Sequence, residues 1–234
     1  MLAPACLAET CQSPVLHVLQ LSVPACGTSR LVVGDGSAPA PLPAGGGISG
    51  CAAIADDGRL LAAWFEHPAI PRASVYAEWQ ALRLAMRLAA GYRPGTVTLV
   101  TDNRSVAAGA ILALAGTRPA ALLGVHDPDA ATEIRRLAAG RHPAITYRGG
   151  KPSAHLTAGS PLGRTAHTAA WLVRRIAAGG ADPAEHADWI AATAARAPRF
   201  KEDLRRAYFR RFGWPPAPPA AAPYPAAEAQ APSA

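Results

Sequence analysis

Short apolar runs separated by turn residues predict the first strands of this chain. One run is Leu31-Val32-Val33, and two longer runs, residues 48–55 and 59–65, flank Asp56-Asp57-Gly58. Because Asp-Gly between apolar runs favours a tight turn, the two longer runs predict a β-hairpin. A further apolar stretch, residues 15–23, is expected to form an added strand or a docked arm.

The next segment has the spacing of an amphipathic helix. Ser74 is expected to cap a helix that runs to about residue 90. Glu78 lies beside the apolar face of this helix, which is formed by Val75, Trp79, Leu82 and Met86. Glycine and proline at 91–95 end the helix, and the β-branched run 96–101 predicts a strand that is followed directly by Asp102.

Helices outnumber strands in the rest of the chain. We expect helices over residues 104–115, 129–139, 165–178, 182–197 and 200–212, and a last strand over 144–148. This order predicts an α/β fold, a mixed five-stranded sheet flanked by helices with a C-terminal helical extension. The predicted units are an N-terminal extension (1–29), an α/β domain (30–178), a basic helical extension (179–213) and a disordered Pro/Ala-rich tail (214–234).

Positive charge is concentrated towards the C-terminus. Residues 1–140 contain 10 Lys/Arg and 10 Asp/Glu, whereas residues 141–213 contain 13 and 5. Such an excess is typical of a solvated basic face or of a surface that binds a polyanion, because phosphates release counterions when protein cations replace them. In the helix predicted at 200–212, basic residues alternate with aromatic ones, which suits either nucleic-acid binding or packing on the domain.

The composition argues against several other classes of protein. Half of the chain is apolar, which is enough for a substantial core. The four cysteines, Cys6, Cys11, Cys26 and Cys51, form no Cys-x-x-Cys pair, so we expect neither a zinc site nor a disulfide framework. The first twelve residues lack the basic and apolar regions of a signal peptide, and no apolar run has membrane-spanning length. We therefore expect a cytoplasmic protein without a membrane partner.

Three acidic residues occur at positions where ordinary surface acids are not expected. Asp35 and Asp102 follow apolar strand patterns, and Glu78 interrupts the apolar pattern of a helix. Buried carboxylates repel one another unless a cation lies between them. The three acids therefore predict a divalent-metal site.

The motifs around these acids resemble the ribonuclease H family, in particular its plant and reverse-transcriptase-associated branch. The resemblance covers about residues 30–178. Its motifs, in chain order, are Asp35-Gly36-Ser37, Gly45-Gly46-Gly47-Ile48, Asp57-Gly58, Ala77-Glu78-Trp79-Gln80-Ala81-Leu82 and Val100-Thr101-Asp102-Asn103. The resemblance implies that Asp35 on the first strand, Glu78 on the first helix and Asp102 at the end of the fourth strand are catalytic residues and metal ligands.

The chemistry implied by this resemblance is hydrolysis of the RNA strand of RNA/DNA hybrids. Two Mg²⁺ ions would act at the scissile phosphate, one activating water and the other stabilising the leaving 3′ oxygen. Carboxylate oxygens suit Mg²⁺. The expected nucleic-acid contacts are Gly36, which allows close approach to the backbone, and Ser37, Asn103, Arg148, Lys151, His155 and Arg164.

The fourth acid of the family is missing. The closing helix of the family carries an aspartate, whereas this chain has His167 and no Asp or Glu between Glu133 and Asp182. We expect His167 to complete the site as a catalytic residue and fourth metal ligand, or to be a helix histidine without metal contact. Because an imidazole is a poor Mg²⁺ ligand and removes a negative charge, His167 predicts weaker Mg²⁺ binding or a preference for Mn²⁺.

Two other functions stay open on the same residues. A transposase or integrase would use Asp35, Asp102 and Glu133, although the motifs at Asp35 and Glu78 favour ribonuclease H. A non-catalytic RNA- or hybrid-binding module would keep the fold with reduced metal affinity, which His167 and the basic C-terminal region permit. A proofreading exonuclease is excluded, because Ser37 and Leu172 occupy positions where it requires acids. The sequence gives no indication for or against a protein partner.

Overall fold

The computed structural model describes residues 14–25, 30–39, 46–70, 72–116, 128–148, 160–198 and 200–213. Its strands are β1 (His17–Ser22), β2 (Leu31–Ser37), β3 (Gly47–Ala55), β4 (Arg59–His67), β5 (Thr98–Thr101) and β6 (Ala144–Tyr147). Its helices are α1 (Ala73–Ala89), α2 (Arg104–Leu114), α4 (Pro128–Ala138), α5 (Pro161–Ala178), the short 3-10 helix η1 (Pro183–His186), α6 (Ala187–Ala195) and α7 (Lys201–Phe212). Within these ranges, no helix has both the length and the apolar character that crossing a bilayer requires.

The six strands form one mixed sheet in the order β1-β4-β3-β2-β5-β6. The first four strands in this order, β1, β4, β3 and β2, pair antiparallel with their neighbours. The predicted hairpin joins β3 to β4. β5 and β6 instead run parallel to β2, with helices in the connections between them. Pairing therefore changes from antiparallel to parallel across β2, in the middle of the sheet.

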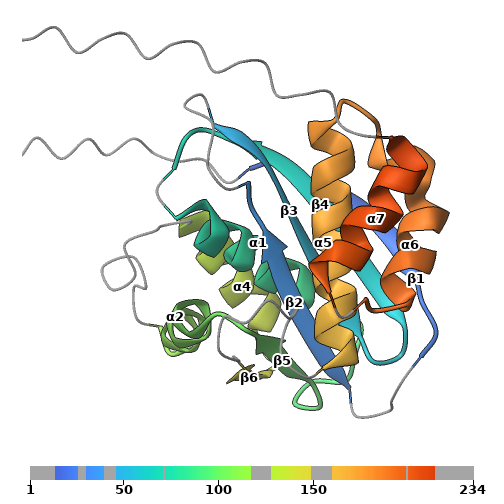
Figure 1. The fold of residues 1–234 in the computed structure, drawn as a ribbon. Helices are drawn as coiled ribbons and strands as arrows, with labels where there is room; N and C mark the ends of the chain where they lie inside the picture. The colour runs from blue at the N-terminus through green and yellow to red at the C-terminus, as the bar shows by residue number, and fades with distance from the viewer. Residues whose placement is uncertain are drawn as a thin grey trace, which may run out of the picture.

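One face of the sheet is covered by α1, with α2 and α4 beside it (Figure 1). The core on this face combines strand residues such as Val32 and Phe65 with apolar residues of α1 such as Leu82. The helix approaches β2 closely, because β2 has glycines on this face. A Cβ at Gly34 would lie only 3.1 Å from the carbonyl oxygen of Ala81.

The opposite face is covered by α5, on which α6 and α7 pack (Figure 1). Strand residues that alternate with those of the first core, such as Val33 and Ile54, point to this side. Leu204 and Tyr208 of α7 are buried in the same core. The basic side chains of α7 stay exposed, namely Lys201, Arg205, Arg206, Arg210 and Arg211. The apolar side of this helix thus packs on the domain while its charges face solvent.

The structure differs from the sequence-based expectation in a few elements. The sheet has a sixth strand beyond the five predicted, because the stretch at 15–23, expected to form an added strand or a docked arm, contains β1, which pairs along β4. The expectation that Ser74 caps the first helix is wrong: α1 starts at Ala73, and its N-cap residue Arg72 has φ 57 and no side-chain capping bond. Helix α5 starts at Pro161, one turn earlier than predicted, since proline fits the first turn of a helix.

Some predictions concern residues outside the described ranges. The tail at 214–234 and three of the cysteines, Cys6, Cys11 and Cys26, are among them. The described cysteine, Cys51, is buried with a free thiol, and burial raises its pKa far above the ordinary value.

Candidate metal centre

Asp35 and Asp102 come from neighbouring parallel strands. Val33 of β2 is paired with Val100 of β5, so continuing this register by two residues places Asp35 beside Asp102. Asp35 lies within β2 and is 3% exposed, whereas Asp102 follows the end of β5 and is exposed. The parallel pairing therefore brings two acids that are distant in sequence to the same end of two neighbouring strands.

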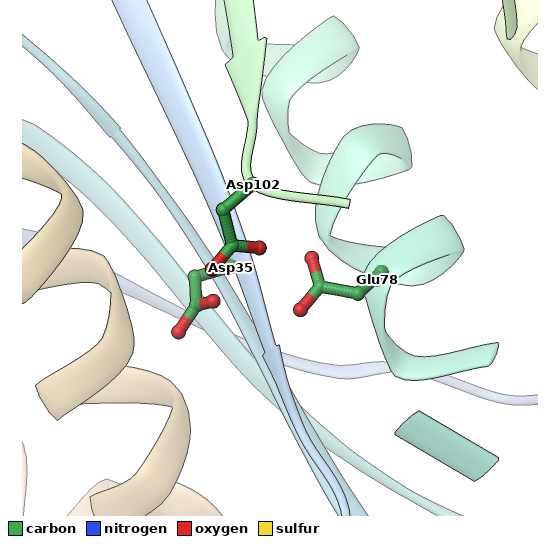
Figure 2. Close-up of side chains that lie close together, drawn as sticks. All are labelled: Asp35, Glu78 and Asp102. Carbon is green, nitrogen blue, oxygen red and sulfur yellow. The ribbon is translucent and has the colours of Figure 1, made fainter. Parts of the chain in front are cut away.

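Glu78 reaches the same place from α1 (Figure 2). The main-chain N–H of Gly36 donates a hydrogen bond to Oε1 of Glu78 at 3.1 Å. Position 36 requires glycine, because a Cβ there would lie 2.5 Å from the carbonyl carbon of Ala77 and 2.6 Å from the nitrogen of Glu78. Gly36 thus permits the close approach of α1 that places Glu78 against β2. Its contact with nucleic acid stays a prediction.

The three carboxylates form one cluster. One oxygen of each lies within 4.8 Å of the others, and Figure 2 shows the side chains converging from β2, α1 and the end of β5. Burial, and next the charges of Asp35 and Asp102, raise the pKa of Glu78 well above its ordinary value. Loss of surrounding water and the charge of Asp35 raise the pKa of Asp102 to about 6, although His167 opposes this. Without a counter-charge the ionised cluster is therefore destabilising.

A divalent cation fits this cluster. Glu78 is 8% exposed, and its Oε2 is buried without a hydrogen-bond partner among the described residues. Carboxylate oxygens are the ligands that Mg²⁺ and Mn²⁺ prefer. Asp35, Glu78 and Asp102 are the residues that would hold such an ion.

His167 contacts the cluster through Asp35. Its Nδ1 donates a hydrogen bond to Oδ2 of Asp35 at 2.6 Å, from the side of α5. Burial lowers the pKa of His167, but the adjacent Asp35 carboxylate raises it by more than burial lowers it. The net shift of the pKa is upward and favours the protonated ring. Nδ1 is occupied by this bond, which leaves Nε2 for any other partner. Metal ligation by His167 stays a prediction.

Glu133 has a different environment. Its carboxylate on α4 pairs with Arg83 and with Arg87 of α1, the latter at 2.9 Å. Its side chain is 14% exposed, and it is not part of the three-acid cluster. Because guanidinium groups engage both of its oxygens, this geometry disfavours the transposase alternative that required Glu133.

Two of the expected nucleic-acid contacts lie next to the carboxylates. The hydroxyl of Ser37 accepts a hydrogen bond from Nε of Arg174 at 3.0 Å. Asn103 follows Asp102, and its Oδ1 caps α2 by accepting from the N–H groups of the second and third residues of that segment, Ser105 and Val106. Asn103 therefore has a structural role that anchors the end of β5.

The other expected contacts lie further along the chain. Arg148 is exposed just after β6, where its N–H donates to the carbonyl of Thr101 at 3.0 Å. The guanidinium of Arg164 donates to the carbonyl of Ala197 at 3.1 Å, which ties α5 to the end of α6. Lys151 and His155 lie outside the described residues.

Three side chains near the cluster were not anticipated. Trp171 and Arg174 follow His167 on α5 by one and two turns, and Lys201 of α7 is close enough that its charge lowers the pKa of His167. The helical spacing from His167 was a usable signal for the first two. No sequence pattern related Lys201 to this place, because α7 packs there through tertiary contacts.

Comparisons with known proteins give similarities to solved structures. No protein-family model and no curated protein matches the chain. The chain is similar to the RNase H1 of the halophilic archaeon Halobacterium salinarum NRC-1, with 17% identity over 51% of this chain and 84% of that chain, and a TM-score of 0.34. For the PFV RNase H domain the identity is 18%, the coverage 72% and 94%, and the TM-score 0.40.

LC11-RNase H1, solved in complex with an RNA/DNA hybrid, gives 14% identity, coverage of 53% and 88%, and a TM-score of 0.36. The fold assignment depends on this chain's own features. Its sheet changes from antiparallel to parallel pairing across β2, helices cover both faces, and the clustered acids lie within β2, on α1 and just after β5. These features give the chain a ribonuclease H-like fold.

Proposed function

We propose that this protein is a metal-dependent endoribonuclease that hydrolyses the RNA strand of RNA/DNA hybrids. The observation that supports this most is the convergence of Asp35, Glu78 and Asp102, whose oxygens lie within 4.8 Å of one another on a ribonuclease H-like sheet. A pure binding module would gain nothing from a cluster of carboxylates that repel one another.

Mg²⁺ or Mn²⁺, two ions in the full proposal, would supply Lewis acidity and an activated water at the scissile phosphate. The protein orients two of the ligands in advance, since Gly36 holds Glu78 and His167 holds Asp35. Asp102 is exposed and marks the side of the cluster that is open to solvent. We infer that a phosphodiester approaches from the side of Asp102.

His167 determines the expected metal preference. With an imidazole in place of a fourth acid, the centre has one negative charge fewer, so we expect Mn²⁺ to support activity better than Mg²⁺. The protonated ring would also neutralise part of the charge of Asp35 and hold a proton at Nδ1.

Cleavage of a hybrid labelled on its RNA strand tests the proposal. The wild type is expected to release short RNA products in Mn²⁺ and, more slowly, in Mg²⁺, and to leave duplex DNA intact. Asp102→Asn should lose cleavage, whereas the matched control Glu66→Gln, which neutralises an exposed acid on β4, should retain it. Hybrid binding without cleavage by the wild type in either metal would instead identify a non-catalytic binding module.

A further inference from the structure

A pocket of about 300 Å³ lies between the end of β2, α5 and α7. Its polar lining is formed by Ser37 and His167 together with three basic residues, Arg174, Lys201 and Arg205. Among the residues that the structure describes, no aspartate or glutamate lines it. A concave site with several cations and no acid is suited to an anion.

Arg174 is the most buried of these three cations. Its Nε donates to Ser37 Oγ at 3.0 Å, and no ion pair of this residue is found in the part of the chain that the structure describes. Burial and the neighbouring Arg175 lower the pKa of Arg174 to about 10, so it stays charged at neutral pH. A largely buried guanidinium without a carboxylate partner is unfavourable unless an anion binds to it.

The other two cations are held in place by the fold of α7. Lys201 and Arg205 are one helical turn apart, and Leu204 between them is buried in the core under α5. The two acids in the first turn of α7, Glu202 and Asp203, do not line the pocket. The carboxylate of Asp203 pairs instead with Arg206 at 2.7 Å. Because α7 is anchored by buried residues, the backbone that carries the two cations is fixed before a ligand binds, and only their side chains lose freedom on binding.

The pocket is adjacent to the carboxylate cluster. His167 lines the pocket and also donates to Asp35 through Nδ1, and Gly36 contributes to both places. The ring of Trp171 provides an apolar wall and is fixed by an edge-on contact with Tyr208, with centroids 5.5 Å apart. A ligand with a phosphate next to a flat or apolar group would match both the cations and the tryptophan.

We propose that this pocket binds a backbone phosphate of the nucleic acid close to the carboxylate cluster, with Arg174, Lys201 and Arg205 as its ligands. The identity of the polymer rests on the proposed function. Phosphate recognition itself rests on the pocket alone. The C-terminal extension would then be part of the substrate-binding surface.

Hybrid binding by the full-length chain in the presence of EDTA tests this proposal, because cleavage is then prevented. Fluorescence anisotropy would compare the wild type with the double variant Lys201→Gln/Arg205→Gln. The matched control is Arg210→Gln/Arg211→Gln, which removes the same charge from exposed positions of α7 outside the pocket. We expect the pocket variant to bind about 10-fold more weakly or worse and its salt slope to fall by about 1, since each neutralised phosphate contributes about 0.9 to that slope and the pocket holds one.

Equal losses in the two double variants, or no loss in the pocket variant, would overturn the proposal. Thermal unfolding verifies that each variant folds. If the double variant does not fold, the single variant Lys201→Gln replaces it, with a smaller expected loss of affinity and of salt slope. If inorganic phosphate stabilises the wild type but not the pocket variant while both bind hybrid equally, the pocket is a free-anion site and the assignment to nucleic acid is wrong.

Failure of the proposed function has a different signature. A wild type that binds hybrid through the pocket but cleaves nothing would contradict the nuclease proposal and support the pocket. If instead the wild type cleaves hybrid and the pocket variant keeps its affinity and salt slope, the nuclease proposal is supported and the pocket proposal is contradicted.

Discussion

Replacing Asp102 by asparagine should stabilise the metal-free protein while removing its response to metal. In the folded state the pKa of Asp102 rises from 3.8 to about 6, because its carboxylate loses water and faces Asp35. The folded protein therefore binds more protons than the unfolded chain between these values, and the free energy of unfolding falls as the pH rises through this window. Asparagine has a similar shape and no charge, so it avoids this loss.

The size of the effect follows from the pKa shift. A rise from 3.8 to about 6 corresponds to at most about 3 kcal/mol, at about 1.4 kcal/mol per unit. Asp102 is exposed, and solvent screening reduces the expected gain to about 1 kcal/mol. The gain should be small at about pH 4 and complete above about pH 7.

Divalent metal should reverse the order of stability. An ion that binds only the folded wild type at about 100 times its dissociation constant adds about 2.7 kcal/mol. Asp102→Asn lacks one of the three carboxylates and should gain much less. The wild type is thus expected to be less stable than the variant in EDTA and more stable in Mn²⁺.

Urea unfolding followed by tryptophan fluorescence measures these differences, since the chain has five tryptophans. Urea titrations of the wild type and of Asp102→Asn would be run at about pH 4 and at about pH 8, each in EDTA and in Mn²⁺. Glu66→Gln serves as the control for loss of an exposed acid and should follow the wild type. The reasoning is refuted if Asp102→Asn is the less stable protein in EDTA at the higher pH, if its gain is independent of pH, or if metal stabilises both proteins equally.

Three further substitutions test the neighbours of the centre. Gly36→Ala should lower the free energy of unfolding by about 2 kcal/mol or more, because its Cβ would overlap the backbone of α1; in urea unfolding, Gly179→Ala should show a much smaller effect. His167→Ala should weaken Mn²⁺ binding, measured by calorimetry, by about 10- to 100-fold, and unchanged binding would show that the ring does not support the centre. Glu133→Gln should destabilise by about 2 kcal/mol through the loss of its ion pair with Arg83, yet bind Mn²⁺ normally; loss of metal binding would restore Glu133 as a candidate ligand.

The three carboxylates could be found from the sequence because each belongs to a short local pattern. Asp35 and Asp102 end apolar strand runs, and Glu78 interrupts the apolar stripe of an amphipathic helix. These patterns predict the element and the position of each acid within it. The prediction that the acids share one site comes from the repulsion between buried carboxylates and from the resemblance to the ribonuclease H family.

Other features depended on contacts between distant segments. The hydrogen bond from His167 to Asp35 joins residues 132 positions apart. No local sequence pattern distinguishes a histidine that contacts the carboxylate cluster from one that does not. The ion pairs that withdraw Glu133 from the cluster join α4 to α1. Their geometry exists only once both helices pack on the same face of the sheet.

The sequence by itself determined the order of strands and helices, the hairpin at Asp57-Gly58 and the acids that line the centre, because periodicity and turn chemistry act over a few residues. Only the tertiary structure decided that β1 extends the sheet, that Gly36 is required by α1, and that Lys201 and Arg205 reach a pocket beside His167. These outcomes depend on packing between segments far apart in the chain, and packing is set by the shapes of both partners.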